Sequence, residues 1–396
     1  MQRGLLSAVS GNTPSARTSV LDHLSRHSPH AVVLAVSIQR TRRGKHPTVQ
    51  RSLSSVDGSL LSESWGTTGD PAVILRQDLL SLRREAGPVH IALVLPEDVD
   101  VLPFLVELWR ARTASGPLRD RYDAAPVMVG LEPASFMRDI RQVRRSVRLW
   151  NGREHREGMR GAEAVARQVE AADILLVASE VTDDGEQTSA ATAVASHLNP
   201  RAVLVAPEGS TRTVLAPPVH FDRPLPAGFE EEWRARLEPV IVPHARQGCD
   251  FGVESVLWRA RRPLHPGRLA DALSVVMRGV VRGRGHLWLC SCPDSVLAWR
   301  SAGPYLELRE GDRWLEPTTT DAWTAASPQR RTLASWFWHD YYGERRNELV
   351  LTGVGLNKAA LHDKLNSALL TDAELSLGRA GWTAVPDPLM GDSSTR

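Results

Sequence analysis

Lysine is the scarcest charged residue in this 396-residue chain, which contains only Lys45, Lys358 and Lys364. Lysine and arginine together number 48, so nearly all of the positive charge comes from arginine. We interpret this imbalance as codon bias, and the arginine count alone therefore carries little functional weight.

Cysteine and long apolar runs are also scarce. Three cysteines in a chain of this length argue against a disulfide framework and favour a reducing compartment. No apolar run approaches the ~20 residues that span a bilayer, and the N-terminal apolar residues are too few for the core of a signal peptide. These absences predict a soluble cytoplasmic protein with no membrane partner.

The composition that remains is enough for a large folded core. With 42% hydrophobic residues, the length predicts two domains or three. The formal net charge of +2 is close to balance, so charge does not indicate nucleic-acid binding. We expect no direct sequence-specific contact with nucleic acid.

Short aliphatic or β-branched runs alternate with helical patterns through the first half of the chain. Runs that are apolar on both faces and separated by helices are typical of a parallel sheet covered on both sides. The runs lie at 4–9, 31–38, 90–95, 126–131, 173–178 and 201–206. They predict an α/β fold class, with helices on both faces of the sheet.

A second domain follows a stretch rich in proline. The prolines between residues 207 and 248 cannot sustain the interior of a sheet and predict a connector. Beyond it, eight tryptophans stand among mixed strand and helix signals, and we expect most of them in the core. The predicted organisation is a first domain at 1–210, a linker at 211–248, a smaller α+β domain at 249–390 and a disordered tail at 391–396.

The turn after the first apolar run has the outline of a nucleotide loop. A working loop of this class reads GxxxxGKS/T, because glycines turn N–H groups toward a phosphate and the lysine reaches the terminal oxygens. Gly11 and Thr18 keep the outer positions, but the second glycine is Ala16, the lysine is Arg17, and Pro14 lacks an N–H. We expect no lysine from elsewhere to replace the missing one, so these residues alone favour an ordinary strand-turn-helix corner.

Short stretches of the last third follow one another in a recognisable order. They lie at 255–269, 285–289, 293–294, 299–303, 342–350, 369–372 and 381–388. Together they resemble the C-terminal domain of the CobW-like family of P-loop GTPases and metallochaperones. The resemblance implies a P-loop-type GTPase half before it, and segments 168–176 and 198–202 fit that half.

Active members of that family carry a CxCC metal motif just before a segment like residues 75–80. In register with it, the cysteine positions hold Asp70, Ala72 and Val73. Thiolates make such a site soft enough to hold zinc or copper tightly, and one carboxylate cannot replace them. The resemblance therefore implies that the family's metal site is absent.

Two further family motifs are missing in register. The acidic switch motif should follow the run at 90–94, where Glu97, Asp98 or Asp100 could replace its acid only by a register shift. The guanine-reading NKxD motif falls on residues 178–181, which read Ala-Ser-Glu-Val. Phosphoryl transfer depends on all of these groups.

With four motifs lost, we predict a pseudo-GTPase without catalytic residues. Gly11, Ala16, Arg17 and Thr18 would form a vestigial nucleotide loop. Helix capping and turn geometry explain the retained Gly11 and Thr18 equally well.

Cys290 and Cys292 form a separate candidate site. If an apolar strand continues through them, alternation places His286 on the same face, and Cys249 or His265 could supply a fourth metal ligand. We favour core packing, because CxC lacks the two-residue turn of structural zinc knuckles and free cysteine is commonly buried. Metal binding or oxidation is the alternative.

Two other clusters are interpreted as structural. His23, His27 and His30 have helical spacing and predict a surface role. The aromatic segment 336–342 predicts core packing first and a partner surface second.

The resulting hypothesis is a non-catalytic CobW-like binding protein in bacterial zinc or metal homeostasis. Its resemblance to a degenerate actinobacterial branch tied to zinc starvation implies a ribosomal protein or a ribosome hibernation factor as partner, with no cofactor. The alternative is a divergent GTP-dependent metallochaperone that delivers zinc or another metal, with residual binding of GTP and magnesium or of zinc. A metal store at Cys290 and Cys292 is a third interpretation.

Overall fold

The computed structural model describes most of the chain. The described residues are 2–39, 46–97, 99–110, 116–141, 146–150, 155–178, 185–205, 220–240, 244–316 and 320–390. The chain divides into two compact units, Met1–Arg234 and Ala235–Arg396. This division falls inside the segment 211–248, whose exact limits as a linker remain a prediction, and the tail at 391–396 lies outside the described residues. No described helix is long and apolar enough to cross a membrane.

An eight-stranded sheet forms the centre of the first unit, in the order β10-β9-β6-β1-β5-β2-β3-β4. The six strands from β10 to β2 pair in parallel. They coincide with the six apolar runs of the sequence, which confirms the predicted parallel sheet. Their bounds are β1 (Gly4–Gly11), β2 (Val32–Gln39), β5 (His90–Val94), β6 (Tyr122–Leu131), β9 (Ile174–Val177) and β10 (Val203–Val205).

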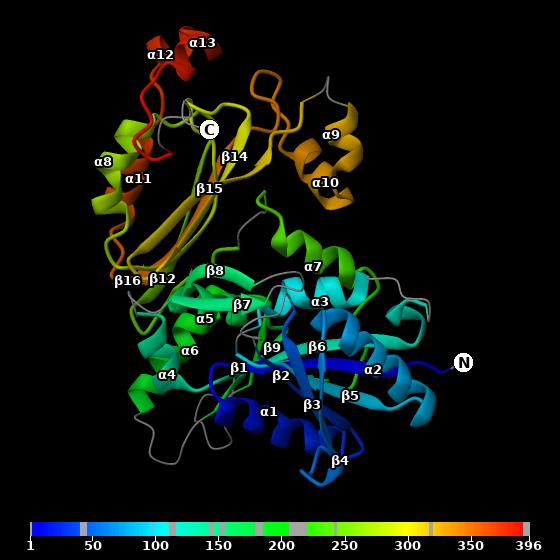
Figure 1. Ribbon diagram of the computed structural model, residues 1–396. Coiled ribbons are helices and arrows are strands. Elements are labelled where there is room, and N and C mark those ends of the chain that lie inside the picture. Colours follow the sequence, from blue (N-terminus) through cyan, green and yellow to red (C-terminus); the bar gives the residue numbers. More distant parts are fainter. Residues whose placement is uncertain are drawn as a thin grey trace. The chain divides into compact units, whose positions relative to one another are not determined.

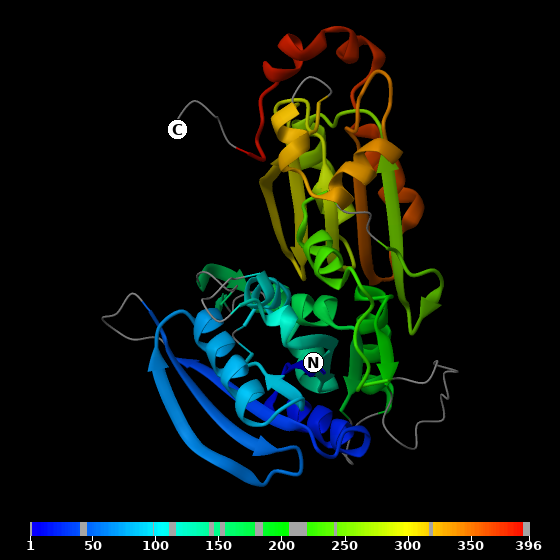
Figure 2. The same cartoon turned by 90° about the vertical axis from the view of Figure 1, so that its right-hand side faces the viewer.

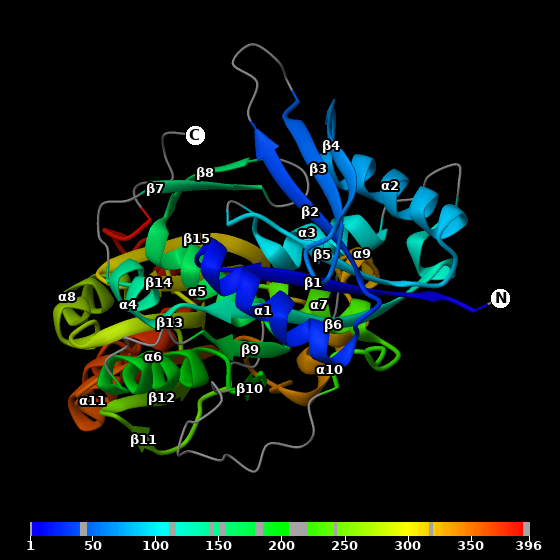
Figure 3. The same cartoon turned by 90° about the horizontal axis from the view of Figure 1, so that it is seen from below.

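An antiparallel hairpin completes one edge of this sheet, and the sequence patterns did not predict it. β3 (Thr48–Ser55) pairs with β2, and β4 (Leu60–Thr68) pairs with β3. Both strands are mostly polar and partly exposed, so they lack the continuous apolar signal of the buried strands. Figure 3 shows them at the end of the sheet away from β9 and β10. A separate ribbon pairs β7 (Ser146–Trp150) with β8 (His155–Arg160).

Helices cover both faces of the sheet, as the α/β class predicts. α1 (Pro14–His27) packs on β1, β6 and β9, with Val20 and Leu24 in the core. α3 (Val101–Arg110) and α5 (Gly161–Ala171) lie on the opposite face in Figure 1. The remaining helices are α2 (Pro71–Glu85), η1 (Leu118–Asp120), α4 (Pro133–Asp139), α6 (Gly185–Leu198) and α7 (Phe229–Leu237).

The second unit is the smaller α+β domain that the sequence predicts. Its antiparallel sheet has the order β11-β12-β16-β13-β14-β15. The strands are β11 (Cys249–Asp250), β12 (Val253–Ala260), β13 (Val280–Leu287), β14 (Ser295–Ala302), β15 (Tyr305–Arg313) and β16 (Asn347–Val354). The main helices are α8 (Pro266–Val276), α9 (Thr320–Ala325), α10 (Pro328–Trp336) and α11 (Lys358–Ser367), followed by the short α12 (Asp372–Ser376) and α13 (Gly378–Thr383).

The helices of this unit lie on both sides of its sheet. α8 and α11 pack together on one face, while α9 and α10 lie on the other, in front of the sheet in Figure 2. Trp258 and Trp299 are buried in the core beneath α8 and α11. Trp288, Trp314 and Trp382 pack in a second cluster, so most of the tryptophans are in the core, as expected.

Two local expectations for this unit are wrong. β13 ends at Leu287, so the strand expected to carry Cys290 and Cys292 stops before them. Core packing, the first expectation for the aromatic segment 336–342, fails because Trp336 is 77% exposed and Tyr341 is 72% exposed. A partner surface there stays a prediction. Trp288, Leu289 and Cys290 after β13 are buried but belong to no named strand, and the aromatic segment beyond Trp336 falls in the turn after α10.

Candidate functional site

The predicted nucleotide loop is an abrupt corner between a strand and a helix. β1 ends at Gly11 and α1 begins at Pro14, which leaves Asn12 and Thr13 as the whole connection. Pro14 suits the first helical position, where its fixed φ is favourable and its missing N–H is no loss. Residues 14–17, which a phosphate loop would spread around its ligand, are here the first turn of a helix.

The backbone donors at this corner already have acceptors. The Thr13 hydroxyl oxygen accepts the N–H of Ala16 at 3.1 Å, and the Thr13 carbonyl accepts the N–H of Arg17 at 3.2 Å. Thr13 is therefore the N-cap of α1. Thr18, for which helix capping is one expected role, lies inside the helix, and its hydroxyl donates a hydrogen bond to the Pro14 carbonyl oxygen at 3.2 Å.

Close packing fills the space beside the corner. Ala16 is fully buried, and a Cβ atom added at Gly130 of β6 would lie 2.1 Å from the Ala16 carbonyl oxygen. The Asn12 side chain fixes this approach, since it donates to the Glu132 carbonyl at 3.0 Å and accepts the Glu132 N–H at 2.8 Å. The glycine at position 130 serves contact between β6 and α1.

Arg17, which stands where a nucleotide loop has lysine, turns back onto its own loop. Its Nη1 donates to the Gly11 carbonyl oxygen at 3.0 Å and lies 4.0 Å from Oε2 of Glu97. Of the acids proposed to replace the switch motif, Glu97 thus faces the arginine. Asp100 is buried and lies 3.1 Å from Arg167, while Asp98 and the NKxD positions 179–181 lie outside the described residues.

These residues do not fit a nucleoside triphosphate with magnesium. The N–H groups of Ala16 and Arg17 are committed to Thr13, and the positive charge of Arg17 is partly balanced by Glu97. A phosphate cradle needs several N–H groups turned toward one point and a cation that can reach the terminal oxygens. The corner offers neither in this arrangement.

The three positions of the CxCC motif have a structural role. Asp70 is the N-cap of α2, and its Oδ1 accepts the N–H groups of Ala72 at 2.8 Å and Val73 at 3.1 Å. Ala72 is buried, whereas Val73 is partly exposed. Within the described ranges, no three His, Cys, Asp or Glu side chains are grouped so that they could hold a metal ion.

Burial also governs the chemistry of the CxC pair. It raises the pKa of the Cys290 thiol to about 11 and that of Cys292 to about 12. The same cause lowers the pKa of the fully buried His286 well below its ordinary value. The thiolate is the form that binds metals and reacts, so thiols held protonated by burial favour the core-packing interpretation.

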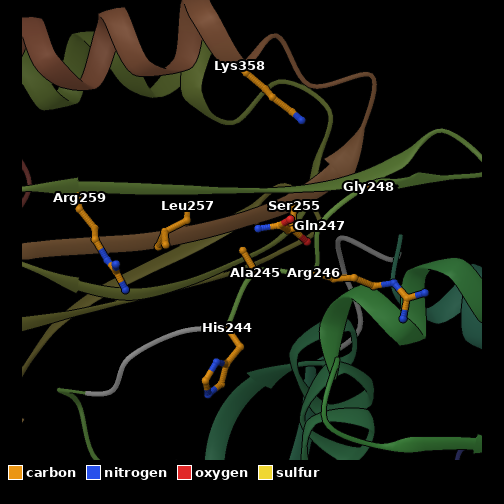
Figure 4. A pocket seen from close by; sticks show the side chains of 9 residues that line it. All are labelled: His244, Ala245, Arg246, Gln247, Gly248, Ser255, Leu257, Arg259 and Lys358. Carbon is orange, nitrogen blue, oxygen red and sulfur yellow. The ribbon is translucent and has the colours of Figure 1, made fainter.

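A cleft in the second unit, which the sequence analysis missed, lies beside β12. Its volume is about 460 Å³, and its walls are residues 244–248, Ser255, Leu257 and Arg259 of β12, and Lys358 at the start of α11. Figure 4 shows these side chains around it. We call this site the β12 cleft. No spacing pattern could have revealed it, because it depends on the path of residues 244–248 past a strand that follows them.

A buried carboxylate orients the arginine of this cleft. Nε of Arg259 lies 2.7 Å from Oε1 of Glu348 on β16, and Nε of Arg346 lies 2.9 Å from the other oxygen. Arg259 and Glu348 are directly opposite in the β12–β16 register. The strand pairing therefore fixes the position of Arg259.

Comparison with known proteins bears on the second unit most directly. Residues 253–369 match the family model described as the cobalamin synthesis protein cobW C-terminal domain. The chain is 28% identical over 233 residues to zinc-regulated GTPase metalloprotein activator 1 of Dictyostelium discoideum, with 57% of this chain and 47% of that protein covered. It is 30% identical over 232 residues to a zinc chaperone of Mycobacterium tuberculosis, with 59% of this chain and 55% of that protein covered.

The matched segment thus spans about half the length of these curated relatives. Among solved structures, the zinc-bound YjiA GTPase from E. coli is similar with a TM-score of 0.35 and 13% identity. That alignment covers 93% of this chain and 100% of the other.

Proposed function

We propose, from the premise that this chain belongs to the CobW-like family, that it is a non-catalytic member that acts by binding in bacterial zinc or metal homeostasis. The cobW C-terminal domain supports the family, and two relatives named for zinc support the process. The scarcity of cysteine supports a cytoplasmic location.

One observation carries the non-catalytic part of the proposal. At the β1–α1 corner, Thr13 accepts the N–H groups of Ala16 and Arg17, and the Arg17 side chain donates to Gly11. A phosphate seated there would have to break these hydrogen bonds, each worth about 1 kcal/mol. It would also compete with Glu97 for the only cation of the loop.

A hydrolysis assay tests this proposal. Phosphate release from GTP and from ATP is measured with magnesium, for the wild-type protein and for Thr18→Ala. We expect phosphate release with either protein to equal the release in buffer alone. The Thr18 hydroxyl is hydrogen-bonded to the Pro14 carbonyl, and on this proposal it positions no magnesium. A rate above the buffer rate that Thr18→Ala reduces would contradict the proposal.

A second function, a divergent nucleotide-dependent metallochaperone, is favoured by one specific observation. Arg17 and Glu97 lie 4.0 Å apart, so a cation and an acid are both present at the corner, and they would have to separate to hold a nucleotide with magnesium. This function predicts saturable nucleotide binding and bound metal in protein purified without chelators. Elemental analysis that finds less than 0.1 equivalent of zinc or copper, together with background hydrolysis, would exclude it.

The partner proposed with the binding function is a ribosomal protein or a ribosome hibernation factor. Affinity capture of the full tagged chain from cells grown with and without zinc tests this partner. We expect recovery of one of these proteins to rise under zinc limitation. Recovery of no ribosomal component and no hibernation factor in either condition would contradict it.

A further inference from the structure

The β12 cleft borders a strand edge that, among the described residues, has no paired strand over most of its length. β11 pairs with β12 only at Val253 and Glu254. Gly248 has a φ of 93°, and residues 244–247 before it belong to no strand. Among the described residues, no strand therefore pairs with β12 on this side beyond Glu254. Backbone N–H and C=O groups along such an edge are ready to pair with an extended segment of another chain.

The cleft also carries a surplus of positive charge. Arg259 and Arg346 share the single carboxylate of Glu348. Glu348 and Arg346 are buried, whereas the Arg259 side chain is 46% exposed. Arg259 is therefore the cation of this group that a ligand can reach. The Arg259 side chain lines the cleft, and a guanidinium favours a carboxylate that accepts from two nitrogens at once.

The other cations around the cleft add less to this surplus. Lys358 lies 2.8 Å from Glu254, and Arg246 lies 3.2 Å from Asp250. Each of these two cations is balanced by an acid of its own. The residues that line the cleft include no aspartate or glutamate, so an anion placed inside it meets only cationic and neutral groups.

We infer that the β12 cleft binds an acidic, extended segment of a protein partner, which adds a strand to the free edge of β12 and pairs a carboxylate with Arg259. This inference deepens the proposed function and rests on it for the existence of a protein partner. Leu257 and Arg259 project from the same face of β12 in Figure 4, two residues apart. The bound segment therefore presents an apolar side chain opposite Leu257 and an acid two residues from it, opposite Arg259.

A short peptide with this pattern is the direct probe. It is a fluorescein-labelled heptamer of threonines in which the second, fourth and sixth residues are glutamate, leucine and glutamate. Because this pattern is symmetric, the peptide presents the same side chains to β12 whether it binds parallel or antiparallel to that strand. Fluorescence anisotropy of the full chain at low salt is expected to give saturable binding that weakens as salt rises. The same heptamer with glutamine in place of both glutamates is expected to bind at least about fivefold more weakly.

Protein variants locate the binding. Arg259→Gln is expected to weaken the glutamate peptide about fivefold and to leave the weaker binding of the glutamine peptide unchanged. Lys358→Ala is expected to weaken binding about twofold, because Lys358 has its own acid partner. Lys364→Ala removes an exposed lysine of the same helix that is not part of the cleft, and no change is expected.

Backbone methylation separates strand addition from simple charge attraction. A glutamate heptamer N-methylated on alternate amides can pair through only one of its edges. We expect one of the two methylation patterns to abolish binding and the other to preserve it. Equal binding of both patterns would overturn strand addition.

Other outcomes would overturn the inference as a whole. The first is saturable binding of a single-stranded RNA oligonucleotide without binding of the peptide. The second is displacement of the peptide by free phosphate or glutarate at the same concentration as the peptide. The third is equal affinity of the glutamate peptide for wild type and for Arg259→Gln. The glutamine peptide tests the inference on the unaltered protein if Arg259→Gln fails to fold. None of these measurements uses GTP or ATP. The strand-addition inference can therefore fail while the non-catalytic function stands, and the non-catalytic function can fail while the inference stands.

Discussion

The guanidinium of Arg17 donates a hydrogen bond to the carbonyl oxygen of Gly11, 3.0 Å away. In a working nucleotide loop, the residues at these two positions face a phosphate that lies between them. Here they contact each other, and Thr13 takes the N–H groups of Ala16 and Arg17. The loop is closed by its own side chains and backbone, which is why we treat it as part of the scaffold.

Substitution of Asp70 tests whether the residues at the expected CxCC positions contribute to stability. Asp70→Ala removes the oxygen that accepts the N–H groups of Ala72 and Val73, and we expect it to lower the free energy of unfolding by about 1 kcal/mol. Asp70→Asn keeps a capping oxygen and should lie close to wild type. Urea denaturation of the three proteins measures the difference, and equal stability of the alanine and asparagine variants would contradict the capping role.

Substitution of Gly130 by alanine tests whether β6 and α1 are in close contact. A Cβ atom at this position meets the Ala16 carbonyl oxygen at 2.1 Å, so Gly130→Ala must push the strand and the helix apart. We expect a loss of about 1–3 kcal/mol of stability. Gly185→Ala is the matched control, because nothing lies within 4 Å of a Cβ atom there. A Gly130→Ala protein as stable as Gly185→Ala would show that the corner is not tightly packed.

His90 makes the stability of the first unit depend on pH. Its ring nitrogens lie 2.7 Å from the Ser7 hydroxyl and 3.1 Å from the Ser28 hydroxyl, and burial lowers the pKa of His90 to about 4. The folded state therefore resists a proton that the unfolded state accepts below pH 6.5, so stability falls as the pH drops from 6.5 toward 4, by up to about 3 kcal/mol.

Denaturant titrations at pH 7 and pH 5 measure this effect of His90. His90→Gln keeps a hydrogen-bonding side chain but does not titrate, so it should lose less stability between the two pH values than wild type. Identical losses in both proteins would show that the imidazole is not responsible.

The cysteines should differ sharply in reactivity. Cys249 is exposed, Cys290 is buried and Cys292 is partly buried. Burial raises the pKa of the Cys290 and Cys292 thiols and disfavours their reactive thiolates. With a thiol-specific chromogenic reagent at pH 8, we expect one fast equivalent, which Cys249→Ser removes. The other two should react only in denaturant, and fast labelling of all three in the folded protein would rule out the buried thiols described above.

The parallel core of the first unit could be predicted from sequence because its strands are buried on both faces. Runs such as 90–95, apart from His90, and 126–131 are apolar, and they lie in β5 and β6. The hairpin of β3 and β4 could not be predicted in the same way. Its strands lie at the sheet edge with polar, partly exposed residues, so no apolar period marks them.

The same distinction applies to the candidate sites: residue identities can be read from the sequence, but contacts between distant residues cannot. The presence of Arg17 where a nucleotide loop has lysine is visible in sequence, but the contact of Arg17 with Gly11 is not, since it depends on where α1 begins. Likewise, Arg259 stands in a recognisable stretch, but its role depends on Glu348, 89 positions later, which only the pairing of β12 with β16 brings opposite it. Side chains brought together by strand register leave no local signal.

Direct titration of a fluorescent GTP analogue with magnesium into the wild-type chain tests the central claim. The closed corner at Gly11 and Arg17 predicts no saturable binding up to millimolar nucleotide, and the same flat response for Arg17→Ala. Saturable binding in the micromolar range that Arg17→Ala abolishes would mean that the corner opens to hold a triphosphate, and would contradict a non-catalytic protein.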